Sequence, residues 1–426
     1  MNTSSCLAQH HVTIFESPDP GRIHCYSPGI CRLPSGRLVA TFDLGGAGAG
    51  ELPGAKWPRG EMGWAWQGKI YSSDDAGRSW THRADFPFMH ARPFVSGDRV
   101  YVLGQAGDLT ILRSDDRGET WTAPATLSKG QCWHQAPSNV HYANGCVYLA
   151  MERRTRFQVQ GWYVGDMAPV LMRARLDDDL TRRENWTFAS ELSFYDVVDE
   201  AALNGFGVPF YAADPVHGVV VAPSRHCNPM GWLETNVVQF TDPAHLWHDP
   251  AGKTFHLWMR AHTGSTGYAC IAKVVELGDE PGTGAMTTLL EKAPSGKTLL
   301  YIPCPGGQMK FHVLHDEATK LFWLLSTQAT DSMIRPDRMP ADRFNLPNNE
   351  RRRMQLHFSK NMVDWCFAGL VAAGGVEKAS RHYASMAMNG ADLLVLSRSG
   401  DERAKTPHDG NLITFHTVRN FRSLVY

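Results

Sequence analysis

An eight-residue motif occurs twice in this chain, as SDDAGRSW at Ser73–Trp80 and as SDDRGETW at Ser114–Trp121. An altered copy, SKNMVDW, occupies Ser359–Trp365. The Asp can accept bonds from backbone N–H groups of its own turn, and the Gly permits a positive φ. The Ser or Thr hydroxyl adds a bond, and the Trp is expected to pack between neighbouring sheets. The motif therefore predicts a turn that closes a hairpin, and it does not indicate a catalytic or calcium site.

A hairpin pattern recurs over most of the chain, while long helical periodicity is nearly absent. Each copy has an apolar strand, a turn rich in Gly, Ser, Asp or Asn, and a second apolar strand. Six copies can be counted, at Ser27–Phe42, Ala91–Gly104, Ala136–Met151, Asp242–Met259, Lys310–Ser326 and Tyr383–Ser397. At 426 residues the chain exceeds the size of a single hydrophobic core, so these copies predict an all-β repeat architecture.

The repeated octet is similar to the Asp-box of the sialidase superfamily, and the resemblance spans about residues 20–425. Together with hairpins of blade length, it implies a β-propeller. We expect an N-terminal segment, residues 1–20, followed by one catalytic propeller domain, residues 21–426. Six blades are countable, and a further hairpin at Asn204–Ser224 would make seven.

The phase of the repeat predicts which side chains line the centre of the propeller. The inner strand of each blade begins near the axis, so residues at the start of each first strand should line a shared funnel. These residues are Ser27, His90, Arg92, His134, Asp242, Lys310, His382 and Tyr383.

The site differs from that of a sialidase in one position. Sialidases hold the sugar carboxylate with three arginines and attack with a Tyr that a Glu activates. Ser27 stands where the resemblance implies the first arginine, and a serine cannot form a bidentate pair with a carboxylate. Arg260 follows Asp242 as the second arginine follows the sialidase Glu, one of Arg351–Arg353 would be the third, and Tyr383 falls at the nucleophile. We therefore expect negligible turnover of a sialoside.

Other phrases resemble a branch of sialidase-like bacterial proteins that degrade polysaccharides, related to ulvan lyases and to enzymes that cleave rhamnose–glucuronate linkages. These phrases are Trp133–Glu152, Gly231–Val238, Pro305–Phe311 and His408–Arg422. The resemblance implies an acidic oligosaccharide of the uronic acid or rhamnose type as the substrate, cleaved by exo-action.

Three residues are the candidate catalytic groups. His134 can act as acid or base near neutrality, and its matching residue in the branch implies a catalytic role; the alternative is a core histidine. Glu234 lies beside Trp232, which would desolvate the carboxylate toward general-acid use, unless Glu234 is structural. Tyr383 could be a nucleophile, a proton donor or a stacking ring.

Cationic and aromatic residues near the inner strands are the candidate substrate-binding groups. Basic side chains there could hold a uronate carboxylate or a sulfate, and indoles could stack on a sugar ring. The predicted set is Arg92, Trp133, Arg225, His226, Trp232, Asp242, Arg260, Lys310 and His382. We expect Glu152, by contrast, to form an ion pair with Arg153 or Arg154.

Three functions remain open. In hydrolysis, Glu234, His134 and Tyr383 would serve around the anomeric carbon, and the carboxyl groups of Glu234 and Asp242 favour this reading. In β-elimination from a uronate, His134 and Tyr383 would act with Arg225 or Arg260 as the neutralising cation. A non-catalytic glycan-binding propeller is the third reading, because fold alone does not give function.

Composition bears on partners and location. The net charge is −1 and Arg351–Arg353 is the one basic run, so no nucleic-acid partner is expected. No apolar run reaches the roughly 18 residues of a membrane helix. Nine scattered cysteines and an N-terminus without a signal pattern favour a cytoplasmic protein with reduced thiols. The histidines show no dependable metal spacing, and we expect neither a metal nor another cofactor.

Overall fold

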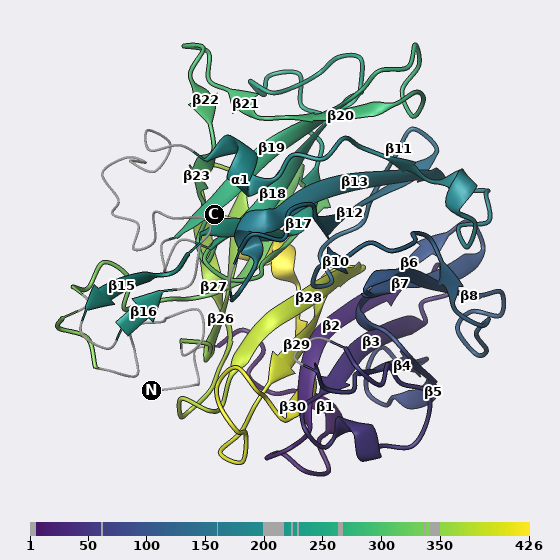
Figure 1. Cartoon of the computed structure of the whole chain (residues 1–426), viewed down its shortest axis with the longest axis vertical. Coiled ribbons are helices and arrows are strands. Elements are labelled where there is room, and N and C mark those ends of the chain that lie inside the picture. Colours follow the sequence, from purple (N-terminus) through teal and green to yellow (C-terminus); the bar gives the residue numbers. More distant parts are fainter. Residues whose placement is uncertain are drawn as a thin grey trace.

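The computed structural model describes residues 6–60, 63–159, 161–198, 217–222, 225–227, 230–262, 267–335, 337–340 and 350–426. Across these ranges the chain is almost entirely β, and α1 (Phe194–Val197) is the single α-helix. Six antiparallel sheets of four or five strands surround a central axis (Figure 1). They form the six blades of a β-propeller, as the hairpin count predicted. The described residues contain no helix that is long and apolar enough to cross a membrane.

The first three blades follow one another along the chain, each from its inner to its outer strand. Blade 1 consists of β2 (His24–Arg32), β3 (Leu38–Gly45), β4 (Gln67–Ser73) and β5 (Thr81–Phe86). Blade 2 consists of β6 (Met89–Ser96), β7 (Arg99–Ala106), β8 (Asp108–Ser114) and β9 (Ala125–Thr126). Blade 3 consists of β10 (Trp133–His134), β12 (Cys146–Arg154), β13 (Met167–Arg175) and β14 (Thr187–Phe188), with β11 (His141–Ala143) also paired to β12.

The last three blades repeat this order. Blade 4 consists of β17 (Gly231–Val238), β18 (Thr254–His262), β19 (Tyr268–Glu276) and β20 (Met286–Leu289), with β23 (Tyr301–Pro303) added to β19. Blade 5 consists of β24 (His312–Asp316), β25 (Leu321–Thr327), β26 (Arg353–Ser359) and β27 (Cys366–Ala373). Blade 6 consists of β28 (Arg381–Asn389), β29 (Asp392–Ser399), β30 (Leu412–Val418) and β1 (Val12–Glu16).

Two short two-stranded sheets lie outside the blades. β21 (Glu291–Lys292) pairs with β22 (Thr298–Leu299), and β15 (Val219–Ala222) pairs with β16 (Arg225–Cys227) in a hairpin that projects from the ring (Figure 1). The expected seventh hairpin, Asn204–Ser224, lies mostly outside the described residues, and its described part belongs to β15.

The fourth hairpin does not begin where the sequence pattern placed it. The expected inner strand at Asp242 is a loop, and the inner strand is β17, which ends at Val238. Leu246 and Trp247 gave the loop the apolar pattern of a strand. Leu246 is exposed at 70%, whereas Trp247 stacks on His256 of β18 with ring centroids 5.3 Å apart. The apolar residues of this loop therefore cap the blade instead of pairing in it.

The N-terminal strand closes the ring. β1 pairs antiparallel with β30, with Val12 opposite Phe415 and Thr13 opposite Thr414, and it is the outer strand of blade 6. Upstream, Leu7 and Ala8 donate backbone hydrogen bonds to Leu370 and Val371 of blade 5. The expected separation of residues 1–20 from the propeller therefore fails, because β1 lies within it.

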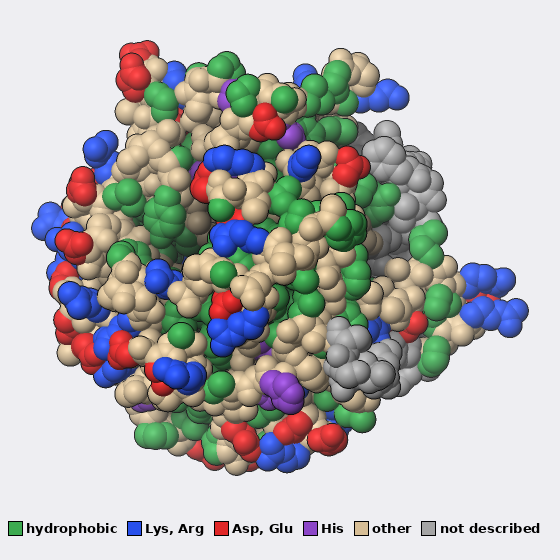
Figure 2. Space-filling model, turned by 180° about the vertical axis from the view of Figure 1, so that it is seen from behind, with side chains coloured by type: hydrophobic (Ala, Val, Ile, Leu, Met, Phe, Trp, Pro, Cys, Tyr) green, Lys and Arg blue, Asp and Glu red, His purple; other side chains and the backbone are tan. Residues whose placement is uncertain are grey.

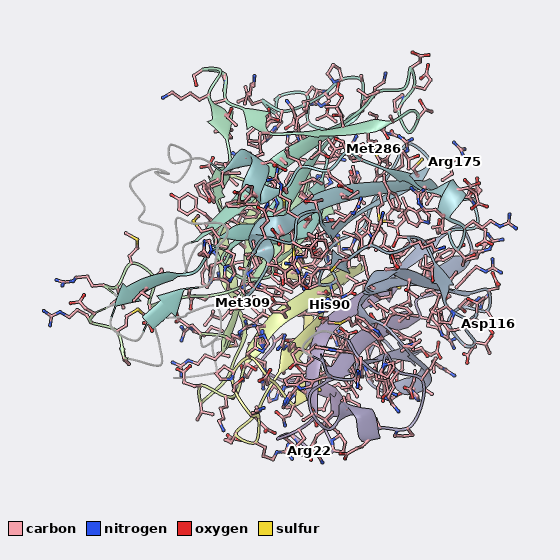
Figure 3. All side chains as sticks on the ribbon, viewed as in Figure 1. Arg22, His90, Asp116, Arg175, Met286 and Met309 are labelled. Carbon is pink, nitrogen blue, oxygen red and sulfur yellow. The ribbon has the colours of Figure 1, made fainter. Side chains whose placement is uncertain are left out.

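The repeated octets form the turns that their sequence predicted. In the first copy, Asp75 accepts from Ser79 N at 2.9 Å and Ser73 Oγ accepts from Gly77 N at 2.9 Å. Gly77 has a φ of 89°, and Trp80 Nε1 donates to its carbonyl oxygen at 3.1 Å. The second copy repeats these bonds around Asp116. Figure 3 shows Asp116 at the edge of the molecule and His90 near its centre, so the octets lie far from the axis.

The hydrophobic core is divided into clusters between neighbouring blades. Phe42 and Leu44 of blade 1 pack with Leu396 and Phe415 of blade 6 in one cluster. Trp80 of the first octet adds its ring against Phe415, with centroids 5.4 Å apart. Each blade thus buries both faces against its neighbours, which leaves the strand ends near the axis free to line sites. Figure 2 shows acidic and basic side chains interspersed around the rim of the face turned away in Figure 1.

Candidate active site

Four inner strands share a backbone irregularity at the position nearest the axis. Ser27, His90, Glu234 and Tyr383 have φ values of 45°, 57°, 59° and 51°. At each of them the pairing register with the second strand shifts, as in a β-bulge. Left-handed backbone costs energy for a residue other than Gly, and such strain clusters at functional sites. The bulges turn these four side chains toward one cavity.

This upper cavity has a volume of about 310 Å³ and lies at one end of the central axis. All four bulge residues line it, together with His134 of blade 3 and Arg260 of blade 4. The remaining lining includes Tyr26, Trp64, Trp66, Gln135, Ala136, Trp162, His262, Arg351, Arg398, His408 and Asp409. Of the predicted catalytic groups, the structure brings together all three: His134, Glu234 and Tyr383.

Tyr383, Glu234 and Arg260 form the centre of the cavity. Tyr383 Oη donates to Glu234 Oε1 at 2.5 Å, and Arg260 Nη1 donates to Tyr383 Oη at 2.7 Å. The same nitrogen lies 3.4 Å from Glu234 Oε2. The carboxylate that Arg260 contacts is therefore Glu234, whereas the resemblance had placed Asp242 at the position of the sialidase Glu. Burial raises the pKa of Tyr383, while Arg260 and Arg351 oppose this shift, so the phenol needs Glu234 to take its proton.

Two further guanidinium groups flank the Tyr383 ring. The Cζ atoms of Arg351 and Arg398 each lie 5.3 Å from the ring centroid. Arg398 also lies 4.2 Å from the centroid of the Tyr26 ring, directly beside Ser27. Burial lowers the pKa of Arg351 to about 9, and the nearby Arg398 and Arg260 add to that shift. Three cations thus converge on one phenol and one carboxylate, which is an arrangement that favours a bound anion.

Arg398, the third of these guanidinium groups, corrects the prediction that was based on Ser27. Ser27 lines the cavity as predicted, but the inference that the arginine set is incomplete is wrong. Arg398 of β29 lies opposite His382 in the sheet, the residue before Tyr383. Arg260 of β18 lies opposite Leu233, the residue before Glu234. Arg398 and Arg260 therefore occupy equivalent places in blades 6 and 4, which is a repeat signal that the sequence reading missed.

Imidazoles form another side of the cavity. The rings of His90 and His134 are 4.7 Å apart in a T-shaped contact, and Trp162 lies 5.2 Å from His134. Burial lowers the pKa of His134 to about 3, with Arg260 as a second cause. Nδ1 of His134 is buried and has no hydrogen-bond partner in the described part of the chain. The neutral ring can therefore accept a bond or a proton from a ligand.

His408 and Asp409 lie on the loop before β30 and reach the same cavity. His408 Nδ1 is 2.8 Å from Asp409 Oδ1, and Tyr26 Oη donates to that same oxygen at 2.8 Å. Arg398 donates to the carbonyl oxygen of His408. His408 was not among the predicted site residues, because a loop residue after a second strand carries no periodic signal in the sequence.

Several predicted binding residues lie beneath the cavity wall. His382 is fully buried behind Tyr383 and contacts Arg351 Nη1 through Nδ1 at 3.0 Å. Lys310 is buried, and its Nζ donates to Ala384 O and to Ser385 Oγ. Burial lowers the pKa of Lys310 to about 7, although Glu234 opposes that shift. Arg92 lines a second cavity, described below, and not the upper one. The structure thus gives these three residues no contact with the upper cavity.

Both predicted tryptophans are core residues. Trp133 Nε1 donates to Gln131 Oε1 at 2.9 Å, and its ring meets Phe188 edge-on at 5.8 Å. Trp232 Nε1 donates to Met167 O at 2.8 Å, and the ring is fully buried. Trp133 directly precedes His134, and because side chains alternate across a strand it points away from the cavity. Trp232 lies two positions before Glu234, and the bulge at Glu234 breaks the alternation between them. Neither indole can stack on a sugar there.

The last predicted residues lie elsewhere. Asp242 is an exposed loop residue that accepts from Ala244 N at 2.9 Å, so its predicted place in the funnel is wrong. Arg225 and His226 belong to β16, and their side chains lie outside the described part. Glu152 is buried and accepts from Thr235 N and Oγ1 at 2.9 and 2.6 Å, so the expected ion pair with Arg153 or Arg154 is wrong. Burial raises the pKa of Glu152 to about 7.

Comparisons with known proteins give structural neighbours only. No family model and no curated protein matches this chain. An α-L-arabinanase of Penicillium chrysogenum, complexed with arabinobiose, has 12% identity over 97% of this chain and 98% of its own, with a TM-score of 0.51. A Hadza microbial sialidase has 14% identity over 98% of this chain and 69% of its own, with a TM-score of 0.53.

A mutant sialidase of Trypanosoma rangeli that displays trans-sialidase activity has 11% identity, with a TM-score of 0.55. That match covers 99% of this chain but 61% of the sialidase chain, so the trypanosomal protein is substantially longer. At such identities the likeness concerns the fold. This chain therefore shares the β-propeller fold of these sialidases and this arabinanase.

Proposed function

We propose that this chain is an exo-acting glycoside hydrolase that removes a terminal sugar acid from an acidic oligosaccharide. The observation that carries the proposal is the contact of Tyr383 Oη with Glu234 at 2.5 Å and Arg260 at 2.7 Å, flanked by two more guanidinium groups. Tyr383 is the nucleophile and Glu234 its base. Arg260, Arg351 and Arg398 hold the carboxylate of the sugar.

A phenol suits a sugar that carries its own negative charge near the reacting carbon. A carboxylate nucleophile would repel such a substrate, whereas tyrosine is neutral until Glu234 takes its proton. Tyrosine nucleophiles are a known exception to the carboxylate pair of glycosidases. The cluster of three cations then stabilises both the substrate carboxylate and the phenolate that forms. This argument favours a sugar acid whose carboxylate is close to the anomeric carbon. Uronates, as in rhamnose–uronate linkages, are the second class of acidic substrate.

The reaction has two balanced steps. In the first step, Tyr383 Oη bonds to the anomeric carbon as the glycosidic C–O bond breaks, Glu234 accepts the phenolic proton, and a protonated imidazole gives its proton to the leaving oxygen. In the second step, water attacks the anomeric carbon and gives a proton to that imidazole, the bond to Tyr383 breaks, and the proton on Glu234 returns to the phenolate. Two displacements retain the anomeric configuration.

Two imidazoles are placed to transfer the proton of the leaving group. Burial and Arg260 lower the pKa of His134, and burial with Arg398 and Arg351 lowers that of His408. A substrate carboxylate bound by the three arginines offsets their charge, so it raises the pKa of both rings toward neutrality. Proton transfer is thereby coupled to the presence of an acidic substrate.

The size of the site supports the proposed exo-action. A cavity of about 310 Å³ lies at the lower end of small-molecule sites, which hold roughly 300–1,000 Å³. It accommodates one sugar and part of a second. Buried residues such as Lys310 and Ser385 lie beneath it, so an intact polymer cannot thread through.

The test is a panel of oligosaccharides ending in a 2-keto sugar acid or in a uronate, each with its carboxyl-reduced counterpart. Mass spectrometry should show a hydrolysis product from one acidic class and none from its reduced form. Tyr383→Phe should lower kcat by about 10²-fold or more, the range for losing such a group. A fluorinated analogue that slows the second step should label the peptide containing Tyr383.

Other products would contradict the proposal. A product lighter by one water than the hydrolysis product would show β-elimination and would make the chain a lyase. Binding of the acidic sugars without any turnover, unchanged in Tyr383→Phe, would make it a glycan-binding propeller.

A further inference from the structure

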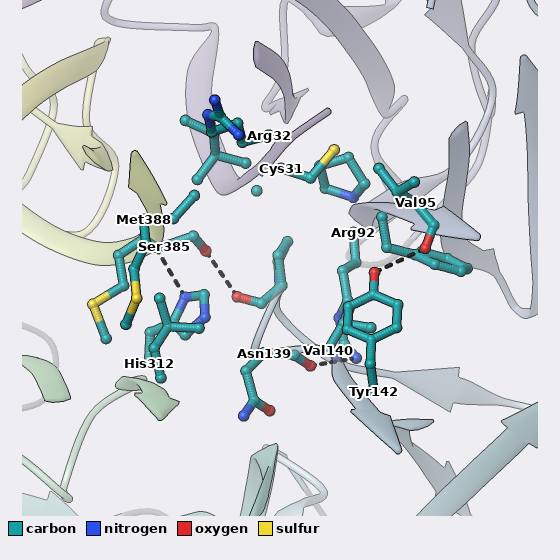
Figure 4. A pocket seen from close by; sticks show the side chains of 18 of the residues that line it. Cys31, Arg32, Arg92, Val95, Asn139, Val140, Tyr142, His312, Ser385 and Met388 are labelled. Carbon is teal, nitrogen blue, oxygen red and sulfur yellow. Dashed lines mark hydrogen bonds between the residues drawn. The ribbon is translucent and has the colours of Figure 1, made fainter. Parts of the chain in front are cut away.

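A second and larger cavity, of about 770 Å³, is lined by other residues of the inner strands, and Figure 4 shows it from close by. β2 contributes Ser27 to the upper cavity and then Gly29–Arg32 to this one. β28 contributes Tyr383 to the upper cavity and then Ser385–Met388 to this one. The two cavities are therefore opposite ends of one set of strands, and we call this one the lower cavity.

Arginine and histidine side chains line the lower cavity, and no carboxylate of the described residues does. Among the described residues that line it are Arg32, Arg92, His312 and His315, and no Asp or Glu. Arg92 is 2% exposed, and its acceptors are all uncharged: Asn139 O at 3.1 Å, Ala150 O at 3.0 Å and the side chain of Gln135. Burial lowers the pKa of Arg92 to about 10, although the charge of Glu152 opposes that shift. Because none of the hydrogen-bond acceptors described for Arg92 is charged, an anion in the cavity would stabilise this buried cation further.

Two buried donors in this cavity lack a partner. His312 Nδ1 accepts from Met386 N at 3.0 Å, so the proton of the neutral ring lies on Nε2. Nε2 of His312 and Nε of Arg92 are both buried and have no partner among the described residues. Figure 4 shows the two side chains on opposite sides of the cavity. Leaving a buried donor unpaired is costly, and an oxygen-bearing ligand would relieve that cost.

The rest of the wall fits a ring with an apolar face. Ile30, Phe94, Met386 and Met388 line the cavity, and Tyr142 lies at its edge with 48% of its surface exposed. Tyr142 Oη donates to Val95 O at 2.8 Å, which fixes the plane of the ring. A volume of 770 Å³ far exceeds that of an inorganic anion and lies within the usual range for organic ligands.

We propose that the lower cavity is a second binding site, for a saccharide that carries a carboxylate or sulfate group. Arg92 receives the oxyanion, Nε2 of His312 donates to another oxygen of the saccharide, and Tyr142 stacks on the sugar ring. The site has no part in the chemistry at Tyr383, and it does not depend on the proposed hydrolase activity. A propeller with a binding site at each end would bind one part of an acidic glycan while it acts on another.

The methionines give a readout confined to this site. Met386 and Met388 line the lower cavity, and no methionine lines the upper one. The protein labelled with ¹³C at its methionine methyl groups should be titrated with a glucuronate-containing disaccharide. We expect saturable shifts of the Met386 and Met388 resonances, which single Met→Leu variants assign. The carboxyl-reduced disaccharide should need at least about a tenfold higher concentration, the equivalent of one lost charged contact.

Two variants and a control complete the test. His312→Asn keeps an acceptor for Met386 N but removes Nε2, and should weaken the binding about tenfold or more. Val140→Trp should fill the cavity and abolish the shifts, while His82→Asn, an exposed histidine outside both cavities, should change nothing. Methyl shifts that are absent, or that are the same for the reduced sugar or in His312→Asn, would overturn the proposal. Saturation by sulfate alone at the same concentration would overturn its saccharide part.

Discussion

Arg398 replaces, from another blade, the guanidinium that Ser27 does not provide. Its Cζ lies 4.2 Å from the Tyr26 ring and 5.3 Å from the Tyr383 ring, between the two inner strands. We expect Arg398→Met to raise KM for the acidic substrate by 10-fold or more, because a charge-assisted bond to the carboxylate is lost. Arg403→Met, an exposed arginine paired with Asp401, is the matched control. If the two variants had the same KM, Arg398 would not bind the substrate carboxylate.

His134 and His408 can be separated by their kinetics. The ring that transfers the proton should, on change to Asn, lose about 10²–10⁴-fold in kcat with little change in KM. A ring that only holds the sugar should mainly raise KM. The sequence assigned the proton to His134, and a loss of kcat in His408→Asn alone would overturn that assignment. Thermal melts of both variants distinguish either result from a core histidine, whose loss lowers stability but not kcat per folded molecule.

The sequence predicted the position of the site more accurately than the set of residues that line it. His134 and Tyr383 were predictable because inner-strand starts recur with each hairpin, whereas Glu234 and Arg260 were named from the family resemblance. Trp133 was misplaced because the residue next to His134 in a strand faces the opposite side, and Trp232 because the bulge at Glu234 breaks the alternation between the two residues. His408 and Asp409 lie on a loop, and their approach to Tyr26 depends on closure of the ring. That contact spans 383 positions and leaves no local signal in the sequence.

At the scale of the elements, the bulges in four inner strands were not predictable. Nothing in the sequence marks Ser27, His90, Glu234 or Tyr383 as left-handed, because that conformation favours Gly. The surrounding sheet imposes it, through the register shift with the second strand. The octet turns were predictable, by contrast, since every bond in them is local.

The octet glycines give a prediction about stability. A Cβ on Gly77 would clash with the Phe415 ring of blade 6, whereas a Cβ on Gly130 meets nothing within 4 Å. Both have positive φ, at 89° and 66°, so either change to Ala costs about 1 kcal/mol in backbone strain. Gly77→Ala should lose a further ~1–3 kcal/mol from overpacking between blades. Denaturant unfolding measures the difference in the free energy of unfolding between the two variants. Equal decreases would mean that the blade interface relaxes to accommodate the methyl group.

For the whole molecule, the repeat predicted the propeller and its six blades, but not how the ring closes. β1 is not followed by an octet and has no neighbouring strand in the sequence with which to form a hairpin. It pairs instead with β30, some 400 residues later, with Val12 opposite Phe415. The same segment bonds to blade 5 through Leu7 and Ala8. The N-terminus thus holds the last two blades, which include Tyr383 on β28 and Arg351 before β26.

Closure of the ring should therefore control the geometry of the site. Tyr383 of blade 6 and Glu234 of blade 4 meet only when all blades keep their angular positions, because their side chains join across the axis. Deleting residues 1–16 should lower Tm by about 5 °C or more and reduce activity further than the loss of folded protein explains. Deleting residues 1–5 keeps β1, Leu7 and Ala8 and is the control. If the longer deletion left kcat per folded molecule intact, the outer strand would stabilise blade 6 without positioning Tyr383.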